Sequence, residues 1–225
     1  MRIARVLMVL LVAVALTACG DDDTTADATG EGLTGVLGIT AGECAGEAIS
    51  GSHFKMVQPG GSVGAGPFVA NSDSACADKT VTALAPGTDG GLRLGTYQPR
   101  TDPAFEPGGS TTAVSVITAT TFFGVGFGIS TNEQDPQSGE TVPPPALEVV
   151  EGELTGDLSA VSVSWNGQDF NQGAPKPGSS DPAGITGTYD ADTGAYTLEW
   201  TSLIEGGPFN GFTGIWHLEG TFTAA

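Results

Sequence analysis

Large apolar residues alternate with small or polar residues along several stretches of the chain. The pattern is clear in Val161–Trp165, in Tyr196–Trp200 and in Trp216–Phe222. A period of two residues is typical of a β-strand that buries one face. All three tryptophans of the chain fall on the face predicted to be buried, which favours packing in a core over stacking on a ligand.

Turn-forming residues separate these alternating stretches. The segment Asp190–Ala195 predicts a β-hairpin loop, because aspartate bonds to the backbone ahead of it and glycine accepts a positive φ. Glu151 and Gly152 mark a similar break. The chain holds 35 glycines and 14 prolines, and this composition favours short strands joined by turns. We therefore predict an all-β fold, either an antiparallel β-sandwich or a β-barrel.

Residues 33–225 are predicted to form a single all-β domain. One of its long polar loops ends in Pro143-Pro144-Pro145, which predicts a stiff, extended connector. A subdivision into two parts near residues 143–145 is the alternative. We favour one domain, because neither half alone shows a full set of core strands.

The stretch Thr121–Asn132 (TFFGVGFGISTN) places glycines at Gly124, Gly126 and Gly128. Neither a dinucleotide fingerprint nor a P-loop fits this spacing, since no helical run and no Gly-Lys-Ser/Thr ending follows. As a strand, the stretch has one apolar face that begins at Phe123 and one face without side chains. We expect a neighbouring aromatic ring to cover this bare face. The alternative is a flat floor for a ligand such as a sugar or an acyl chain.

The first residues have the pattern of a signal peptide: two arginines and then an unbroken apolar run of about eleven residues. Such a run is too short for a permanent membrane span. The sequence Leu16-Thr17-Ala18-Cys19 resembles the lipobox of bacterial lipoproteins. The resemblance implies that residues 1–18 are a signal peptide cleaved before Cys19. It also implies that the sulfur of Cys19 carries a diacylglyceryl group and that its new amino group is a further acylation site.

Residues 19–32 are acidic and contain no basic or aromatic residue. We expect them to be a disordered tether. The formal net charge of the chain is −19, which argues against binding nucleic acid or anionic lipid surfaces. We expect the acyl chains to hold the protein at the extracytoplasmic face of the cell membrane. The acids are more simply explained by surface solubility than by cation binding, since no calcium-loop pattern occurs.

With Cys19 assigned to the lipid anchor, Cys44 and Cys76 are left as an even pair of cysteines. An oxidising compartment predicts a disulfide bond between them. A metal site is a poorer interpretation, because no histidine set accompanies the two cysteines. We predict no metal and no cofactor.

The chain offers little that points to catalysis. It has two histidines, His53 and His217, and both are predicted to face outward, with Glu219 beside His217. A histidine–carboxylate pair can orient a base, but no Gly-x-Ser-x-Gly elbow occurs. We therefore predict a protein that is not an enzyme. A hydrolase acting on envelope carbohydrate or lipid is the alternative, because 26 acidic residues always allow some carboxylate pair.

The loop Trp165–Gln172 gathers amides and aromatic residues. Its Asn166, Gln168 and Asn171 are candidate ligands for the hydroxyl groups of a glycan. The simpler interpretation is a polar surface loop whose Asn and Gly form turns. Together with the glycines of the bare strand, these three residues make up the candidate binding set.

The run GGPFNGFTGIWHLEGTF near the C-terminus and the segment FNQGAPKPG resemble stretches of secreted bacterial, mainly actinobacterial, proteins. The resemblance implies no particular activity and adds no site residue. We conclude that the sequence predicts a membrane-anchored, non-enzymatic binding module whose partner is a glycan or lipid of the cell envelope. A structural or interaction protein is a further alternative, and the sequence leaves the oligomeric state open.

Overall fold

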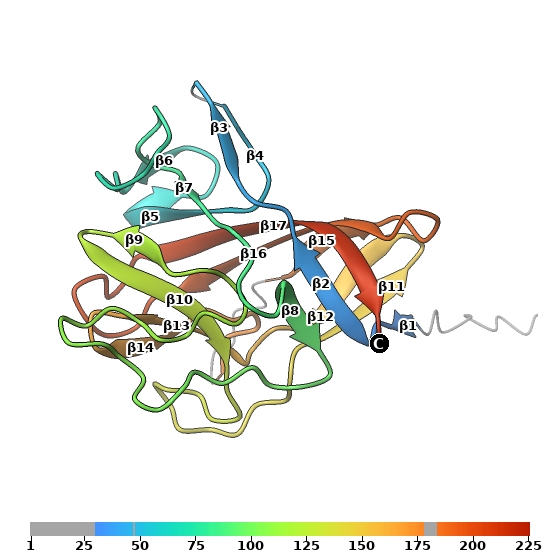
Figure 1. Ribbon diagram of the computed structural model, residues 1–225. Helices are drawn as coiled ribbons and strands as arrows, with labels where there is room; N and C mark the ends of the chain where they lie inside the picture. The colour runs from blue at the N-terminus through green and yellow to red at the C-terminus, as the bar shows by residue number, and fades with distance from the viewer. Residues whose placement is uncertain (1–29, 47, 178–183) are drawn as a thin grey trace, which may run out of the picture.

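The structure is a computed structural model that describes residues 30–46, 48–177 and 184–225 (Figure 1). These residues form strands and turns, and the predicted all-β class is confirmed. No helix long and apolar enough to cross a membrane occurs in the described part of the chain. The strands are β1 (Glu31–Gly32), β2 (Gly35–Ile39), β3 (Glu43–Ala45), β4 (Ala48–Ser50), β5 (His53–Ser62), β6 (Gly66–Phe68), β7 (Thr82–Ala83), β8 (Gly91–Leu94), β9 (Thr120–Phe122), β10 (Val125–Thr131), β11 (Ala146–Val150), β12 (Glu153–Asp157), β13 (Val161–Trp165), β14 (Gln168–Asn171), β15 (Thr186–Tyr189), β16 (Ala195–Leu203) and β17 (Thr213–Ala224).

Strand β17 is the axis of the larger sheet, which is antiparallel throughout. One edge of β17 pairs with β16 along almost its whole length, from Ala195↔Thr221 to Leu203↔Thr213. The other edge changes partner: its first half pairs with β5 and its second half with β2. Beyond β16 the sheet continues through β15, β12 and β11 to β1. The larger sheet curls partway around, like half of a barrel (Figure 1).

The second sheet has four strands in the order β14-β13-β10-β9 and packs against the β5–β17 region of the larger sheet. Aromatic rings join the two sheets. The ring of Phe127 on β10 lies 5.9 Å from that of Phe54 on β5 and 6.4 Å from that of Trp216 on β17. The side chains of Trp165, Trp200 and Trp216 are all buried, as their alternation predicts.

Strands from both sides of Pro143–Pro145 take part in both sheets. In the larger sheet β2 pairs with β17, and in the smaller sheet β10 pairs with β13. The buried residues of both halves belong to one hydrophobic cluster. The fold is therefore a single all-β domain with two packed antiparallel sheets, and a division at the prolines does not describe it.

The folded part begins slightly earlier than the predicted boundary between tether and domain. Glu31 and Gly32 form β1 and pair with Val149 and Glu148 of β11. These two residues were expected in the acidic tether, and their pairing with a sheet edge overrides their polar composition. Residues 1–29 lie outside the described part of the chain, and so does Cys19.

The predicted hairpin between β15 and β16 is confirmed. Oδ1 of Asp190 accepts hydrogen bonds from the backbone N–H groups of Asp192 and Thr193, at 2.9 and 3.1 Å. The break between β11 and β12 is also a hairpin, in which Glu151 and Gly152 both have positive φ, at 52° and 86°. Local turn chemistry therefore determines these connections, as expected.

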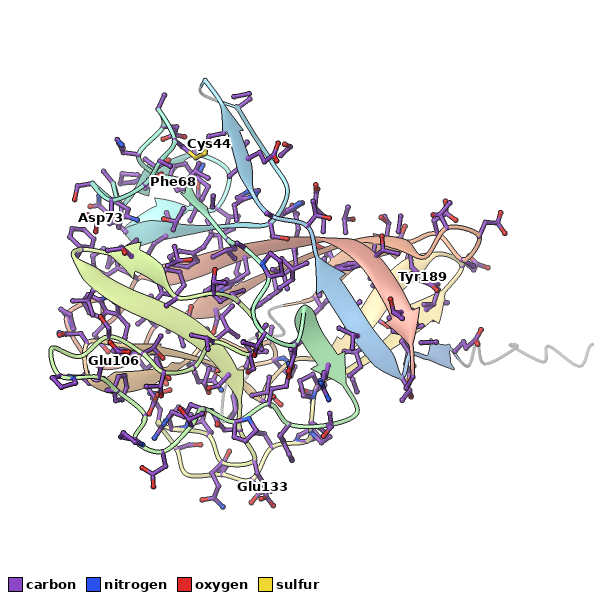
Figure 2. The ribbon with its side chains drawn as sticks, viewed as in Figure 1. Cys44, Phe68, Asp73, Glu106, Glu133 and Tyr189 are labelled. Atoms are coloured by element: carbon purple, nitrogen blue, oxygen red, sulfur yellow. A yellow bond between two sulfur atoms is a disulfide. The ribbon has the colours of Figure 1, made fainter. Side chains whose placement is uncertain are left out.

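The predicted disulfide bond between Cys44 and Cys76 is present, with Cα atoms 5.2 Å apart. It links β3, in the projecting β3–β4 hairpin, to the loop that precedes β7 (Figure 2). Within the described ranges, the hairpin pairs with no strand of the two larger sheets. The covalent bond therefore adds a link between this arm and the body of the domain.

Candidate functional site

Two hollows lie on opposite sides of the four-stranded sheet. On its inner side is a cavity of about 40 Å³ between the two sheets, which we call the aromatic cavity. It is lined by Phe54, Met56, Phe122, Phe127, Val163, Trp165, Phe170, Gln172, Ile204, Phe209 and Trp216. Seven of these eleven residues are aromatic, so the cavity is a gap in a packed aromatic core.

The polar atoms around the aromatic cavity already have partners. Nε1 of Trp165 donates to the carbonyl oxygen of Phe122 at 2.9 Å, and Nε1 of Trp216 donates to Oε1 of Gln172 at 3.3 Å. Buried N–H groups that already have hydrogen-bond partners do not need a ligand to accept from them. A ligand of drug size needs several hundred Å³, so this cavity offers little room without movement of its walls.

The second hollow, which we call the polar cleft, has a volume of about 570 Å³. It is lined by Pro99, Arg100, Thr101, Asp102, Ala104, Asn132, Gln134, Asp135, Pro136 and Asp169. Small-molecule sites have volumes of about 300–1,000 Å³. The polar cleft therefore has the size of a preformed site for a small ligand, and its walls bring together carboxylates, amides and one guanidinium group.

Strand β14 contributes to both hollows. Phe170 lines the aromatic cavity and its neighbour Asp169 lines the polar cleft, because successive side chains of a strand point to opposite faces. Asp169 is held in place from two sides. Its Oδ2 forms an ion pair with Nη1 of Arg100, and its Oδ1 accepts a hydrogen bond from Oγ of Ser164 at 2.6 Å. The carboxylate is thus oriented before any ligand binds.

Arg100 belongs to the loop after β8, far from Asp169 in sequence. Besides the ion pair, its guanidinium lies 5.9 Å from the centre of the Phe105 ring. Planar guanidinium groups both stack on rings and form bonds to carboxylates. The two contacts hold Arg100 at the wall of the polar cleft.

Asp135 is the most deeply buried acid of the polar cleft, with 4% of its surface exposed. Its Oδ1 accepts the backbone N–H groups of Gln137 and Ser138, at 3.0 and 2.6 Å. Its Oδ2 is buried and has no hydrogen-bond partner. A buried oxygen without a donor is costly and calls for an explanation.

The loop that carries Asp135 is fastened to β14. The Nε2 atom of Gln137 donates to the carbonyl oxygen of Asp169 at 2.8 Å, and its Oε1 accepts the backbone N–H of Asn171 at 2.5 Å. Polar contacts between a loop and a strand hold the loop in one position. The polar cleft is therefore a fixed arrangement of three chain segments.

The glycine-rich strand differs from its prediction. Phe123 and Gly124 form the turn between β9 and β10, with φ of 51° and 76°, and Phe123 is 47% exposed. Strand β10 begins only at Val125. The alternation of large and small residues was therefore read across a turn, so Phe123 and Gly124 do not belong to the faces predicted for them.

The bare face of β10 is covered by the chain itself and not by an aromatic ring. A Cβ atom on Gly128 would lie 1.9 Å from the carbonyl oxygen of Ala113. Gly126 faces Ser110, whose Oγ accepts the backbone N–H of Gly126 at 3.1 Å. Backbone from another loop therefore fills the space over Gly128, and the Ser110 side chain lies beside Gly126, so these contacts do not favour a ligand floor there.

The three candidate amides are not brought together. Asn166 has a positive φ in the exposed turn between β13 and β14, and Gln168 is exposed beside it. Asn171 is buried, and its Nδ2 donates to the carbonyl oxygen of Ser159 at 2.7 Å. The structure thus supports the turn interpretation for Asn166 and a structural role for Asn171, while their neighbour Asp169 lies in the polar cleft.

The two histidines form a cluster on the outer face of the larger sheet. Their rings stack with centroids 4.7 Å apart. Nδ1 of His217 lies 2.8 Å from Oε1 of Glu199, and Nε2 lies 3.1 Å from Oε2 of Glu219. The predicted pairing of His217 with Glu219 is therefore present.

The histidine cluster has a structural function that the contacts explain. Oε1 of Glu219 accepts the backbone N–H of Gly51 at 2.8 Å, which links β17 to the end of the β3–β4 hairpin.

The hydrogen bond from His217 lowers the pKa of Glu219. Burial lowers the pKa of His53. No group of three His, Cys, Asp or Glu side chains in the described ranges is arranged to hold a metal ion.

Most residues of the polar cleft could not be identified from the sequence. Its residues come from loops whose composition reads only as turn-forming, such as Asp135-Pro136. Their convergence depends on the paths of two long loops over the outer face of the smaller sheet.

Comparison with protein-family models, with curated proteins and with solved structures finds no match for this chain. The resemblance to secreted bacterial proteins and the lipobox assignment stay predictions.

Proposed function

We propose that the protein is a lipid-anchored, extracytoplasmic binding module that holds a saccharide of the cell envelope in the polar cleft. The observation that carries this proposal is the preformed cleft of about 570 Å³, with its oriented carboxylate, guanidinium and amide groups. The proposal includes no chemical step, so the protein acts by binding. Hydrolysis of the same glycan stays an alternative hypothesis.

The chemistry of the cleft walls suits sugar hydroxyl groups. Each hydroxyl both donates and accepts a hydrogen bond. Asp102 and Asp169 can accept from hydroxyls, Arg100 can donate, and Asn132 and Gln134 can do both. Because Arg100 and Asp169 already hold each other, they lose little conformational freedom when a ligand binds.

A saccharide fits this protein better than a lipid ligand. The polar cleft is large but lined by charged and amide groups. The aromatic cavity is apolar but measures only about 40 Å³. An acyl chain placed in the polar cleft would bury charged groups without partners, which is unfavourable.

The predicted anchor would place this cleft beside the envelope. Cys19 would carry the acyl chains, and the acidic residues that follow would space the domain from the bilayer. Replacing Cys19 with Ser is expected to move the protein from the membrane fraction to the soluble fraction. Equal membrane association of the C19S variant and the unaltered protein would contradict the anchor.

Calorimetry on the full-length protein in detergent tests the binding proposal. Neutral oligosaccharides of glucose, mannose and N-acetylglucosamine are titrated in turn, together with an amine-bearing oligomer of glucosamine. We expect saturable binding of at least one of them, weakened about tenfold by R100A. The matched control is R93A, because Arg93 also forms an exposed ion pair, with Asp89, but outside the polar cleft. No binding of any oligosaccharide, or equal weakening by both variants, would contradict the proposal.

A further inference from the structure

We infer that the polar cleft selects a saccharide bearing a primary ammonium group, which is seated against the carboxylate of Asp135. This inference rests on the proposed function, since it specifies the ligand class of the same site. Two separate observations support it: the balance of charge in the cleft and the unpartnered oxygen of Asp135.

The balance of charge in the polar cleft is negative. Asp102, Asp135 and Asp169 line it, and Arg100 is its one cationic residue among the described lining residues. The guanidinium of Arg100 is already paired with Asp169. Two carboxylates are therefore left without a cation in the cleft wall, and the chain as a whole is strongly acidic, at −19. An anionic saccharide would be repelled here and a cationic one attracted.

Asp135 provides the place where a cation would be held. The backbone N–H groups of Gln137 and Ser138 satisfy its Oδ1 and fix the direction of the side chain. Its Oδ2 is buried and lacks a donor. A carboxylate oxygen in a low-dielectric site gains more from a charged donor than from a neutral hydroxyl.

Lys176 is close enough to Asp135 for their charges to attract each other, but it gives Asp135 no hydrogen bond. Lys176 is buried, and its Nζ donates to the carbonyl oxygens of Asn171, at 3.1 Å, and Leu203. No ion pair joins Lys176 to Asp135 among the described residues. The ammonium of Lys176 is therefore engaged with two carbonyl oxygens, and Oδ2 of Asp135 is left without a donor.

An ammonium group fits this position better than a bound metal ion. It brings three donors and one positive charge. A donor can bond to the unpartnered oxygen, and the charge can offset the excess of carboxylates. A hard divalent cation needs several oxygen ligands converging at short distance. The described residues contain no such cluster of acidic side chains.

Two oligosaccharides that differ only in the group at the nitrogen of each ring test the inference. Glucosamine tetramer carries ammonium groups, and N-acetylglucosamine tetramer has the same rings with neutral amides. We expect calorimetry on the full-length protein at low salt to show about tenfold tighter binding of the glucosamine tetramer. The preference should shrink as salt is added, because screening weakens the ionic contact.

The variant D135N then assigns the preference to one carboxylate. It is expected to reduce the advantage of the glucosamine tetramer to less than about threefold. The matched control is D190N, because Asp190 also accepts two backbone N–H groups in a turn but lies outside the cleft. Circular dichroism establishes that each variant is folded. If D135N does not fold, D102N serves as the second cleft variant and is expected to narrow the same preference.

The outcomes separate this inference from the proposed function. Equal affinity of the unaltered protein for the two tetramers, or a preference for the neutral one, would overturn the ammonium site and leave saccharide binding intact. An unchanged preference in a folded D135N protein would also overturn it. Failure of both tetramers and of all the neutral oligosaccharides to bind would instead overturn the proposed function.

Discussion

The inner face of the four-stranded sheet meets the larger sheet through aromatic rings, whereas its outer face carries serines, glycines and Asp169 under two long loops. Both faces are well buried along β13, where every residue is enclosed. They differ in what encloses them: side chains on one side and loop backbone on the other. The comparison indicates that the inner face provides stability, and that the outer face holds the loops which form the polar cleft.

The largest expected effect on stability comes from removing an aromatic side chain from the inner face. The W216A variant should lower the free energy of unfolding by about 3–5 kcal/mol, because a fully buried aromatic side chain leaves a cavity that its neighbours fill only partly. Chemical denaturation of the full-length protein measures the loss. The control is F123A, whose ring is 47% exposed and whose loss should stay below about 1 kcal/mol. Similar losses for the two variants would mean that the aromatic core is not what stabilises the domain.

A smaller effect tests the outer face. The G128A variant should cost about 1–3 kcal/mol, because the new Cβ atom would lie 1.9 Å from a backbone carbonyl oxygen that cannot rotate away. G126A is the matched control on the same face, since its Cβ atom would find its nearest neighbour at an ordinary 3.5 Å. Denaturation midpoints of the two variants decide the question. A G128A protein as stable as G126A would contradict the close packing of the loop on β10.

The next prediction separates binding from stability. The D169N variant should weaken saccharide binding about tenfold. We expect it to change the free energy of unfolding by about 1 kcal/mol or less, because the ion pair with Arg100 is partly exposed. Calorimetry and denaturation on the same sample measure both quantities. A large loss of unfolding free energy with unchanged saccharide affinity would show that Asp169 stabilises the fold and does not bind the ligand.

The smallest effect concerns pH and the histidine cluster. The hydrogen bond from His217 lowers the pKa of Glu219 below its ordinary value of 4.5. The unfolded chain therefore takes up this proton first as the pH falls. The contribution of Glu219 is fully present above about pH 4.5 and is lost as the pH drops through the lower pKa of the folded state.

Denaturation at pH 7 and at pH 3 measures this contribution. The E219Q variant should lose less stability between the two pH values than the unaltered protein does. The exposed acid Glu153 on β12 gives the control variant E153Q, for which the loss should match that of the unaltered protein. An E219Q profile that overlies the unaltered one would contradict the assigned role of Glu219.

The inner face was readable from the sequence, because its signal is local. Val163 and Trp165 alternate with serines, and their buried side was predicted correctly. The hairpin at Asp190 was equally clear, since its hydrogen bonds lie within four residues. The Cys44–Cys76 bond followed from pairing the cysteines left after the lipobox assignment.

The outer face was not readable in the same way. The backbone near Ala113 covers Gly128. No sequence pattern in either segment predicts that the two segments are in contact. Arg100 and Asp169 meet across 69 positions of sequence. Only the paths of the long loops bring such residues together, and loop paths leave no periodic pattern. From sequence alone, the amides of the β13–β14 hairpin therefore fit a glycan site better than their neighbour Asp169 does.

The central claim is that a saccharide binds in the polar cleft. The most direct test is a titration of the full-length, ¹⁵N-labelled protein in detergent with glucosamine and N-acetylglucosamine tetramers, followed by amide chemical shifts. The account predicts saturable shifts in the non-proline residues of 99–104 and 132–137 and in residue 169, with little change at the non-proline residues of 204–212 beside the aromatic cavity. Shifts centred on residues 204–212, or no saturable shifts with any saccharide, would contradict it.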